Sequence, residues 1–205
     1  MKPQQISAVA FDFDGVLCDT GRMHTAALAK ALKCIVDQEL LEERLEALGT
    51  VPSREKIRLL GICDEDAIER IYTDKQRIFF EQELPPLAVN VPAIFAYCGR
   101  AGFRVAIVSN TNYRLVSSWL QRVVFQFEVP PVFPIITNDW CLPPKPAPDM
   151  YLLAAEMLCL SPEQLLVVED SPNGCAAALR AGCQLMHIEN PYQLSLERLK
   201  QCLSK

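Results

Sequence analysis

The sequence predicts an α/β fold: a doubly wound parallel sheet with a small all-helical cap domain inserted after its first strand. Two observations predict it. Short, nearly continuous apolar runs alternate with segments of helical periodicity, which is typical of parallel strands covered by helices on both faces. One long segment, residues 19–87, departs from this alternation, because it carries helical periodicity without a convincing strand.

Each strand is expected at a short apolar run. The five runs are Ala8–Phe13, Arg104–Ser109, Ile135–Thr137, Leu165–Glu169 and Gln184–Ile188. Helical patterns separate or follow them at Val91–Ala101, Asn112–Val123, Asp149–Leu160, Asn173–Ala181 and Leu194–Leu203. Two proline clusters, Pro130–Pro134 and Pro143–Pro148, are expected to form rigid loops.

The inserted segment has the spacing of several helices. "LLEERLEAL" and "DEDAIERIYTDKQRIFFEQEL" repeat apolar residues at helical intervals, and "LPPLAVNVP" indicates the return to the sheet. We therefore expect an α/β core over residues 1–18 and 88–205 and a helical cap over residues 19–87. The total of 205 residues is enough for one domain with a modest insertion.

Composition favours a small-molecule partner. The formal net charge is -5 and no run is rich in Lys or Arg, which argues against nucleic acid or a membrane surface as a partner. The apolar runs are far shorter than the roughly 20 residues that span a bilayer. The opening "MKPQQISAVAFDFDG" enters a strand pattern without the features of a signal peptide. A cytoplasmic protein, monomeric or weakly homo-oligomeric, is expected.

The nine cysteines do not suggest a metal site or a disulfide framework. No two of them form a Cys-x-x-Cys pair, and several, such as Cys34, Cys98 and Cys159, fall in apolar stretches. They are expected to be buried, reduced thiols that pack as small hydrophobic side chains.

Acidic residues follow two of the expected strands. In "AVAFDFDGVLCDT", Asp12 and Asp14 are two residues apart, a spacing that puts both on one face of a strand. Like charges there repel each other, so a cation or a chemical purpose is needed. "LLVVEDSPNG" adds Glu169 and Asp170 at another strand end. Four carboxylates in such places favour a hard cation such as Mg²⁺.

Two other expected loops carry a hydroxyl and a positive charge instead of carboxylates. "VAIVSNTN" places Ser109 between a strand and a helix, where a hydroxyl and free N–H groups can hold a phosphate oxygen. "PPKPAPD" places Lys145 in a loop that prolines stiffen. Carboxylates, a metal, a hydroxyl and a cation at one sheet edge indicate phosphoryl transfer.

In order and spacing, "DFDGVLCDT", "SN", "KPAPD" and "EDS" resemble the motifs of the haloacid dehalogenase-like phosphohydrolases. The likeness is greatest to the subgroup containing β-phosphoglucomutase and small sugar-phosphate phosphatases, and it covers nearly the whole chain. It implies a Rossmann-like core in which Asp12 attacks phosphorus to form an aspartyl-phosphate. It also implies that Asp14 is the general acid and base, and that Ser109 and Lys145 stabilise the transferring phosphoryl group.

The same resemblance implies the metal ligands. Mg²⁺ would be held by Asp12, the main-chain carbonyl of Asp14 and Asp170, with Glu169 in direct or indirect support. Gly15 would let main-chain N–H groups approach the phosphate, although it could also be an ordinary turn glycine.

Residues of the cap are candidates for binding the rest of the substrate. Lys75 falls inside an apolar helical stripe, so it either reaches past its neighbours to solvent or points into a site. Arg54 in "SRE" resembles a residue that holds a non-reacting phosphate, and would otherwise be a surface charge. Further substrate-binding candidates from the resemblance are Thr20 and His24. Asn110 is another candidate beside Ser109, although it departs from the mutase pattern, which has a small apolar residue there.

The expected function is a Mg²⁺-dependent phosphatase that hydrolyses a small phosphomonoester, such as a sugar phosphate, through an aspartyl-phosphate. One alternative is a phosphosugar mutase with the same nucleophile. Another is a non-catalytic protein that binds a phosphorylated ligand. A nucleotide kinase or dinucleotide enzyme has little support, because the chain has no G-x-x-x-x-G-K-[ST] or G-x-G-x-x-G motif.

Overall fold

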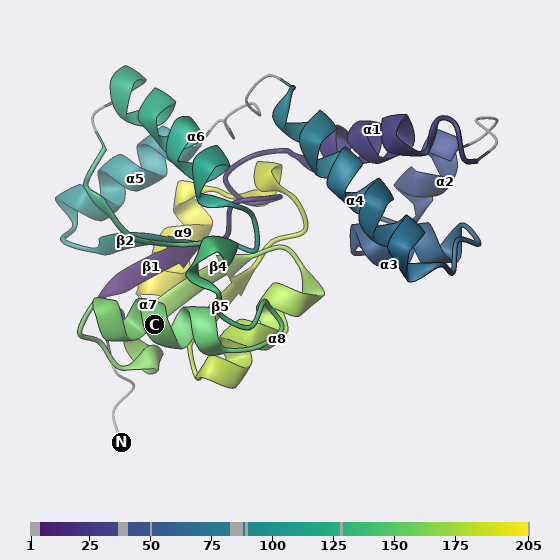
Figure 1. The fold of residues 1–205 in the computed structure, drawn as a ribbon. Coiled ribbons are helices and arrows are strands. Elements are labelled where there is room, and N and C mark those ends of the chain that lie inside the picture. Colours follow the sequence, from purple (N-terminus) through teal and green to yellow (C-terminus); the bar gives the residue numbers. More distant parts are fainter. Residues whose placement is uncertain are drawn as a thin grey trace. The chain divides into compact units, whose positions relative to one another are not determined.

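A computed structural model describes residues 5–36, 41–49, 51–82, 88, 90–127 and 129–204. Its centre is a five-stranded parallel sheet with the order β3-β2-β1-β4-β5 (Figure 1). The strands are β1 (Ala8–Phe11), β2 (Arg104–Val108), β3 (Val132–Ile136), β4 (Leu165–Glu169) and β5 (Gln184–His187). Because β1 lies in the middle and the chain then builds outward on each side, the predicted doubly wound sheet is confirmed.

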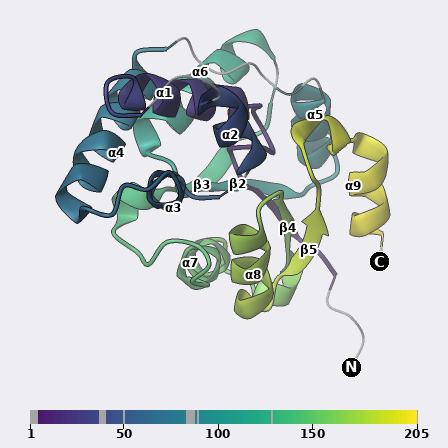
Figure 2. The same cartoon turned by 90° about the vertical axis from the view of Figure 1, so that its right-hand side faces the viewer.

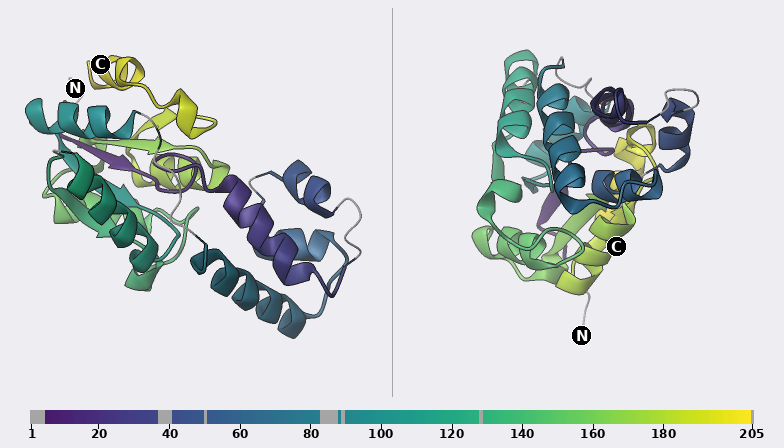
Figure 3. Two further views of the ribbon diagram at one scale, coloured as in Figure 1. Left: turned by 90° about the horizontal axis from the view of Figure 1, so that it is seen from above. Right: turned by 45° about the vertical axis from the view of Figure 1, so that its right-hand side comes forward.

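Helices cover both faces of this sheet (Figure 2). One face carries α5 (Val91–Arg100), α6 (Tyr113–Gln126) and α9 (Leu196–Leu203), and the other α7 (Asp149–Met157) and α8 (Pro172–Ala181). α5 and α9 lie side by side (Figure 3). In the described connections, short 3₁₀ helices lie at Asn138–Trp140, Pro162–Gln164 and Pro191–Gln193.

The two faces of the sheet are packed differently. Ala8, Ala10 and Ala106 belong to one buried cluster with residues of α7 and α8, and their small side chains let these helices lie close to the strands. On the opposite face, the ring of Phe11 lies 5.4 Å from that of Phe95 in α5. Since both faces are covered, the ends of the strands are held in fixed register.

The chain divides into two compact units, Met1–Asp19 with Pro86–Lys205, and Thr20–Pro85. The second unit consists of helices and has an apolar core of its own. Its helices are α1 (Gly21–Leu32), α2 (Leu41–Ala47), α3 (Ser53–Leu59) and α4 (Glu65–Phe80). The side chains of its core include Leu28, Leu32, Leu41, Leu45, Ile57, Ile68 and Ile71.

Four of the five strands differ from their predicted bounds, and the differences are largest for β1 and β3. β1 ends at Phe11, so the alternation of a strand does not apply to Asp12 and Asp14. Residues 130–134 were expected in a loop, but β3 begins at Val132 and includes Pro134. This assignment was wrong because β3 is an edge strand, where a residue without an N–H donor is tolerated.

The cysteines are all free thiols, but the expected burial holds for only some of them. Cys18, Cys98 and Cys183 are buried, whereas Cys34, Cys63, Cys141 and Cys159 are exposed. The prediction was wrong for Cys34 and Cys159, because each lies just beyond the end of a helix and not within its apolar stripe. In the described part of the chain, no helix is both long and apolar enough to cross a membrane.

Candidate active site

The predicted acidic and hydroxyl residues lie where three neighbouring strands end. Phe11 of β1 is in register with Ile107 of β2 and with Val168 of β4. Asp12 therefore follows β1 at the level where Glu169 ends β4, and Ser109 directly follows β2. The three residues are buried at the carboxyl ends of the strands: Asp12 is 7% exposed, Ser109 1% and Glu169 0%.

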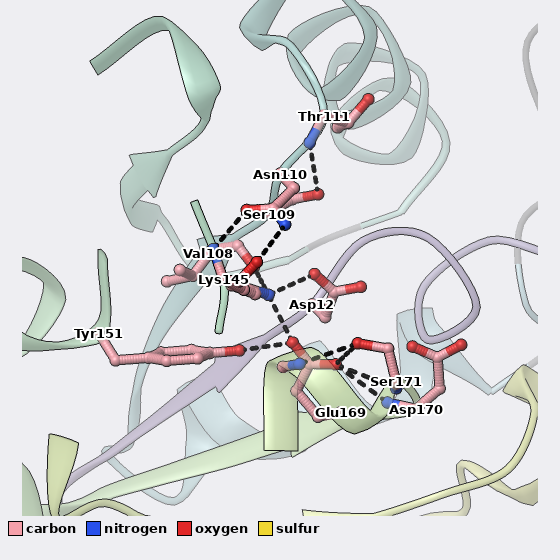
Figure 4. A network of polar contacts seen from close by, with 11 residues as sticks. Asp12, Val108, Ser109, Asn110, Thr111, Lys145, Tyr151, Glu169, Asp170 and Ser171 are labelled. Atoms are coloured by element: carbon pink, nitrogen blue, oxygen red, sulfur yellow. Dashed lines mark hydrogen bonds and ion pairs between the residues drawn. The ribbon is translucent and has the colours of Figure 1, made fainter. Parts of the chain in front are cut away.

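Lys145 connects the ends of these strands. Its ammonium group donates to Asp12 Oδ1 at 2.6 Å, to the main-chain oxygen of Val108 at 2.8 Å and to Glu169 Oε1 at 2.5 Å (Figure 4). An ammonium has three N–H donors, so the side chain is fully used. Lys145 is only 5% exposed, and its charge faces two carboxylates. The side chain is therefore fixed in one place.

Glu169 accepts hydrogen bonds on both of its carboxylate oxygens. Oε1 accepts from Lys145 and, at 2.8 Å, from the hydroxyl of Tyr151. Oε2 accepts from the main-chain N–H groups of Asp170 and Ser171, at 3.2 and 3.3 Å, and from the Ser171 hydroxyl at 3.2 Å. Ser171 caps α8 by accepting from Gly174 N–H. The carboxylate is thus bound to the start of a helix, where negative charge is favoured.

Asn110 and Thr111 organise the segment after β2. The Asn110 amide oxygen accepts from the main-chain N–H of Lys145 at 3.0 Å, and its amide nitrogen donates to the Lys145 carbonyl at 3.4 Å (Figure 4). The Ser109 hydroxyl accepts from the main-chain N–H of Thr111 at 3.1 Å. The structure therefore places the Asn110 side chain on the Lys145 loop, where it fixes that loop to β2; contact with substrate stays a prediction.

The loop after β1 turns sharply. Gly15 has a φ of +77° and donates its N–H to the carbonyl of Cys18 at 2.8 Å, beside a bridge between Asp14 and Cys18. Phe13 is fully buried and its ring meets Trp119 of α6 edge-on at 5.3 Å. The buried Phe13 ring anchors the loop and so fixes the main chain between Asp12 and Asp14.

Burial and mutual repulsion change the acidity of the site. Burial, followed by the charge of Glu169, holds the pKa of Asp12 well above its usual range, although Lys145 acts in the opposite direction. Burial and Glu169 also raise the pKa of Asp170 to about 7. Burial by itself lowers the pKa of Lys145, but Asp12 and Glu169 outweigh it and raise that pKa well above its usual value. The negative charge of the ionised acids would exceed the single positive charge of the Lys145 ammonium.

A divalent cation fits this excess of negative charge. Asp12, Glu169 and Asp170 each offer a carboxylate oxygen, and these atoms lie within 4.8 Å of one another. Oxygen donors of this kind suit Mg²⁺. Space for the Asp170 carboxylate exists because residue 15 is glycine: a Cβ there would lie 2.0 Å from Asp170 Oδ2. The cluster includes three of the four acids predicted as ligands, and Asp14 was expected to contribute its main-chain carbonyl.

Within the helical unit, two of the predicted substrate-binding residues are in contact. Lys75 Nζ lies 2.8 Å from His24 Nδ1, and the His24 ring stacks on Phe79 with centroids 4.2 Å apart. Lys75 is 3% exposed, so the idea that it reaches solvent was wrong. Thr20 is also buried, at 1% exposure, and its carbonyl accepts from His24 N–H at the start of α1.

Arg54 joins the same cluster through an aromatic ring. Its guanidinium lies 3.6 Å from the ring centroid of Tyr72, and Lys75 Nζ lies 6.0 Å from that centroid. Arg54 also pairs with Glu69 through Nε at 2.5 Å and Nη2 at 2.9 Å. The helical unit thus gathers His24, Arg54 and Lys75 around aromatic side chains.

Comparison with known proteins identifies the family. The model of the haloacid dehalogenase-like hydrolases matches residues 6–182. The chain belongs to this family. Protein CbbY of Cereibacter sphaeroides is 31% identical over 191 residues, which cover 86% of this chain and 81% of CbbY. A phosphorylated carbohydrates phosphatase of Thermotoga maritima is 28% identical over 190 residues, 89% of this chain and 84% of that protein.

Solved structures agree with this assignment. CbbY from Rhodobacter sphaeroides in complex with phosphate has a TM-score of 0.68 at 27% identity, with 96% of this chain and 100% of that chain covered. A mutant of that CbbY in complex with xylulose-(1,5)bisphosphate has the same TM-score at 26% identity, with coverages of 95% and 99%. The family and these relatives make the protein a haloacid dehalogenase-like hydrolase that acts on phosphoric monoesters.

Three residues of the hydrolase site were not predicted. All three lie around Glu169. Tyr151 contributes a hydroxyl, and Ser171 contributes a hydroxyl and a main-chain N–H. Gly174 leaves space for the carboxylate because it has no side chain. "SPNG" carries the signature of a helix cap, which indicates a role for Ser171 in α8 but not its bond to Glu169. The contact of Tyr151 depends on how α7 packs against the sheet, for which the sequence carries no signal.

Proposed function

We propose that this hydrolase is a Mg²⁺-dependent phosphatase acting on small phosphorylated sugars through an aspartyl-phosphate on Asp12. The observation that supports it best is the position of Lys145, whose ammonium bridges Asp12 and Glu169 beside Asp170. A nucleophile must be ionised, and the Lys145 ammonium favours the ionised form of Asp12 against the burial and the charge of Glu169 that raise its pKa. The same cation would also stabilise the negative charge of a phosphoryl group on Asp12.

The reaction would take two displacements. In the first, a carboxylate oxygen of Asp12 forms a bond to phosphorus, the ester P–O bond breaks, and Asp14 gives its proton to the leaving oxygen. In the second, Asp14 takes a proton from water, the water oxygen attacks phosphorus, and the Asp12–phosphorus bond breaks to release inorganic phosphate. Ser109 would hold a phosphoryl oxygen at the end of β2, and Lys145 would neutralise the charge on the transferring group.

The metal would be held by carboxylates of Asp12 and Asp170 and the main-chain carbonyl of Asp14. When bound, Mg²⁺ supplies positive charge that offsets the repulsion between these acids and the substrate phosphate. Both oxygens of Glu169 already accept hydrogen bonds, so its part would be to support Lys145 and the start of α8.

The substrate class rests on the relatives and on the helical unit. A related protein is named a phosphatase of phosphorylated carbohydrates, and CbbY has been solved with a sugar bisphosphate. The cluster of His24, Arg54 and Lys75 offers cations and hydrogen-bond donors that suit an anionic, hydroxyl-rich molecule. Hydrolysis needs no group beyond those present, whereas a mutase must also protect its aspartyl-phosphate from water; phosphatase is therefore the function we propose.

Phosphate release tests the proposal. Sugar phosphates, phosphoglycolate, nucleoside monophosphates and an aryl phosphate are each incubated with the protein, with Mg²⁺ and with a chelator. We expect Mg²⁺-dependent release, fastest with a sugar phosphate. Release that is indifferent to the chelator would contradict the metal requirement, and conversion of a sugar 1-phosphate to a 6-phosphate without release would indicate a mutase.

Asp12→Asn tests the nucleophile. The substitution keeps the shape of the side chain but removes its charge, so we expect turnover to fall by at least about 10³-fold. Circular dichroism and thermal unfolding check that the fold is retained. Substantial Mg²⁺-dependent turnover by well-folded Asp12→Asn would rule out the covalent mechanism.

A further inference from the structure

Tyr151 is a buried polar side chain that the proposed reaction does not use. It lies in α7 and is fully buried in the cluster between this helix and the sheet, among residues such as Ala154, Val167 and Ala178. A phenol hydroxyl in an apolar core costs free energy unless it finds a partner. Phenylalanine would fill the same space without that requirement. Packing alone therefore does not explain why residue 151 carries a hydroxyl.

That hydroxyl meets one member of the central ion pair, and the ring meets the other. Tyr151 Oη donates to Glu169 Oε1 at 2.8 Å, while Lys145 Nζ lies 4.9 Å from the centre of the Tyr151 ring (Figure 4). An ammonium near an aromatic face is attracted to it. Tyr151 thus contacts both Glu169 and Lys145, and it touches them from the side opposite to Asp12 (Figure 4).

The other side of the Glu169 carboxylate is closed by α8. Oε2 accepts the N–H groups at the start of this helix. A Cβ on Gly174 would lie 1.9 to 2.2 Å from the carboxylate atoms of Glu169, far inside van der Waals contact. The carboxylate therefore occupies a space that exists because residue 174 has no side chain.

The orientation of Glu169 determines where Lys145 lies. All three ammonium protons are in use, on Asp12, Val108 and Glu169. If the carboxylate turned, Lys145 would follow its Oε1 or lose it, and the bond to Asp12 would lengthen. Tyr151 fixes Oε1 from one side and the space at Gly174 fixes Oε2 from the other.

We propose that Tyr151 is a positioning residue. With the space that Gly174 leaves, it holds the Glu169 carboxylate so that the Lys145 ammonium keeps its hydrogen bond to Asp12. This proposal rests on the proposed function, since it concerns the geometry of the same reaction. Tyr151 acts through Glu169 and does not touch the reacting atoms.

Tyr151→Phe tests the proposal, because it removes the hydroxyl and keeps the ring. We expect kcat to fall about tenfold, the effect of losing one hydrogen bond to a charged group, with KM and the Mg²⁺ concentration for half-activation within about twofold. Tyr192→Phe is the matched control: it removes a hydroxyl that donates to Asp19 at 2.8 Å on the surface, and should leave kcat unchanged. An unchanged kcat in Tyr151→Phe would overturn the proposal.

A double-mutant cycle separates positioning from packing. If Tyr151 acts through Glu169, Tyr151→Phe should lower kcat less than about twofold further in a Glu169→Gln background. A full tenfold loss in both backgrounds would show that Tyr151 acts independently and would contradict the proposal. Gly174→Ala is a second, independent variant: its methyl group displaces Glu169 from the buried network, so we expect a lower kcat together with a lower melting temperature.

A spectroscopic readout does not depend on turnover. The ¹⁵N NMR signal of Lys145 Nζ, assigned by its loss in Lys145→Met, should shift in Tyr151→Phe and stay in place in Tyr192→Phe. If the wild-type protein released no phosphate from any substrate, the proposed function would fail, while this shift would still support the positioning of Lys145. An unmoved signal together with an active wild type would overturn the positioning alone.

Discussion

Each unit of the protein buries a lysine among its candidate site residues, and these two lysines are surrounded by different chemistry. Lys145, in the α/β unit, is 5% exposed and contacts the carboxylates of Asp12 and Glu169. Lys75, in the helical unit, is 3% exposed, and its contacts include the imidazole of His24 and the ring of Phe79, 5.2 Å from Nζ. The contacts of Lys145 are with carboxylates, and those of Lys75 include an imidazole and aromatic faces.

The difference indicates different tasks. A cation between two carboxylates is fixed in place and favours their ionised forms, which suits a group that must not move during a reaction. Single contacts of an ammonium with an imidazole nitrogen or an aromatic ring are weaker than a contact with a carboxylate. We therefore expect loss of Lys145 to affect chemistry and stability together, and loss of Lys75 to affect substrate binding.

The largest effect is expected from Lys145→Met. Methionine keeps much of the volume but leaves Asp12 and Glu169 facing each other without a cation. We expect kcat to fall by at least about 10³-fold, and the free energy of unfolding to fall by about 3 kcal/mol, as when one member of a buried ion pair is removed. Chemical denaturation and phosphate release measure both. A variant of unchanged stability would mean that the two acids do not depend on Lys145.

Asp170→Asn tests the excess of acids around Lys145. The pKa of Asp170 is about 7 in the folded protein because of burial and Glu169, against about 4 in an unfolded chain. Between these values the native state holds more protons, so the free energy of unfolding of the metal-free protein falls as pH rises from about 4 to about 7.

Asparagine does not ionise, so Asp170→Asn should not lose stability over this pH range. Without metal we expect Asp170→Asn to be more stable than wild type at pH 8, by about 2 kcal/mol when the partial exposure of the side chain is allowed for, and equally stable near pH 4. Mg²⁺ should stabilise the wild type at pH 8 and leave the variant unaffected. Thermal unfolding with a chelator and with Mg²⁺ measures this; a variant less stable than wild type at pH 8 without metal would refute the repulsion.

The smallest effect is expected from Lys75→Met. The contacts that it removes include those to an imidazole and to aromatic rings, and they lie outside the α/β unit that carries Asp12. KM for a sugar phosphate should rise about tenfold with kcat within about twofold, because the ammonium acts on the bound substrate and not on the reacting bond. Steady-state kinetics decides this. Unchanged KM and kcat would return Lys75 to a purely structural role.

The sequence predicted the part of the site that strand ends determine. Asp12, Ser109 and Glu169 could be placed together because parallel strands meet at their carboxyl ends, and this depends only on recognising each apolar run. Lys75 was placed on an apolar stripe by helical spacing alone, and the structure buries it beside Ile68, Ile71 and Phe79.

The parts that were missed depend on packing between elements. The hydroxyl of Tyr151 reaches Glu169 only because alanines in β1 and β2 let α7 lie close to the sheet. Gly174 accommodates a carboxylate from the preceding strand, which no local pattern reveals. β3 was predicted too short because Pro134 indicates a loop unless the strand is known to lie at an edge.

The edges of the sheet also affect how the protein behaves at high concentration. A free edge presents unpaired N–H and C=O groups to which another chain can add a strand. In β3, Pro134 removes a donor from the middle of the edge, and its pairing with β2 shifts register between Val105 and Ile107. At the other edge, Arg198 donates to the carbonyl of His187 at the end of β5 at 3.0 Å. These features make both edges poorer templates for strand addition.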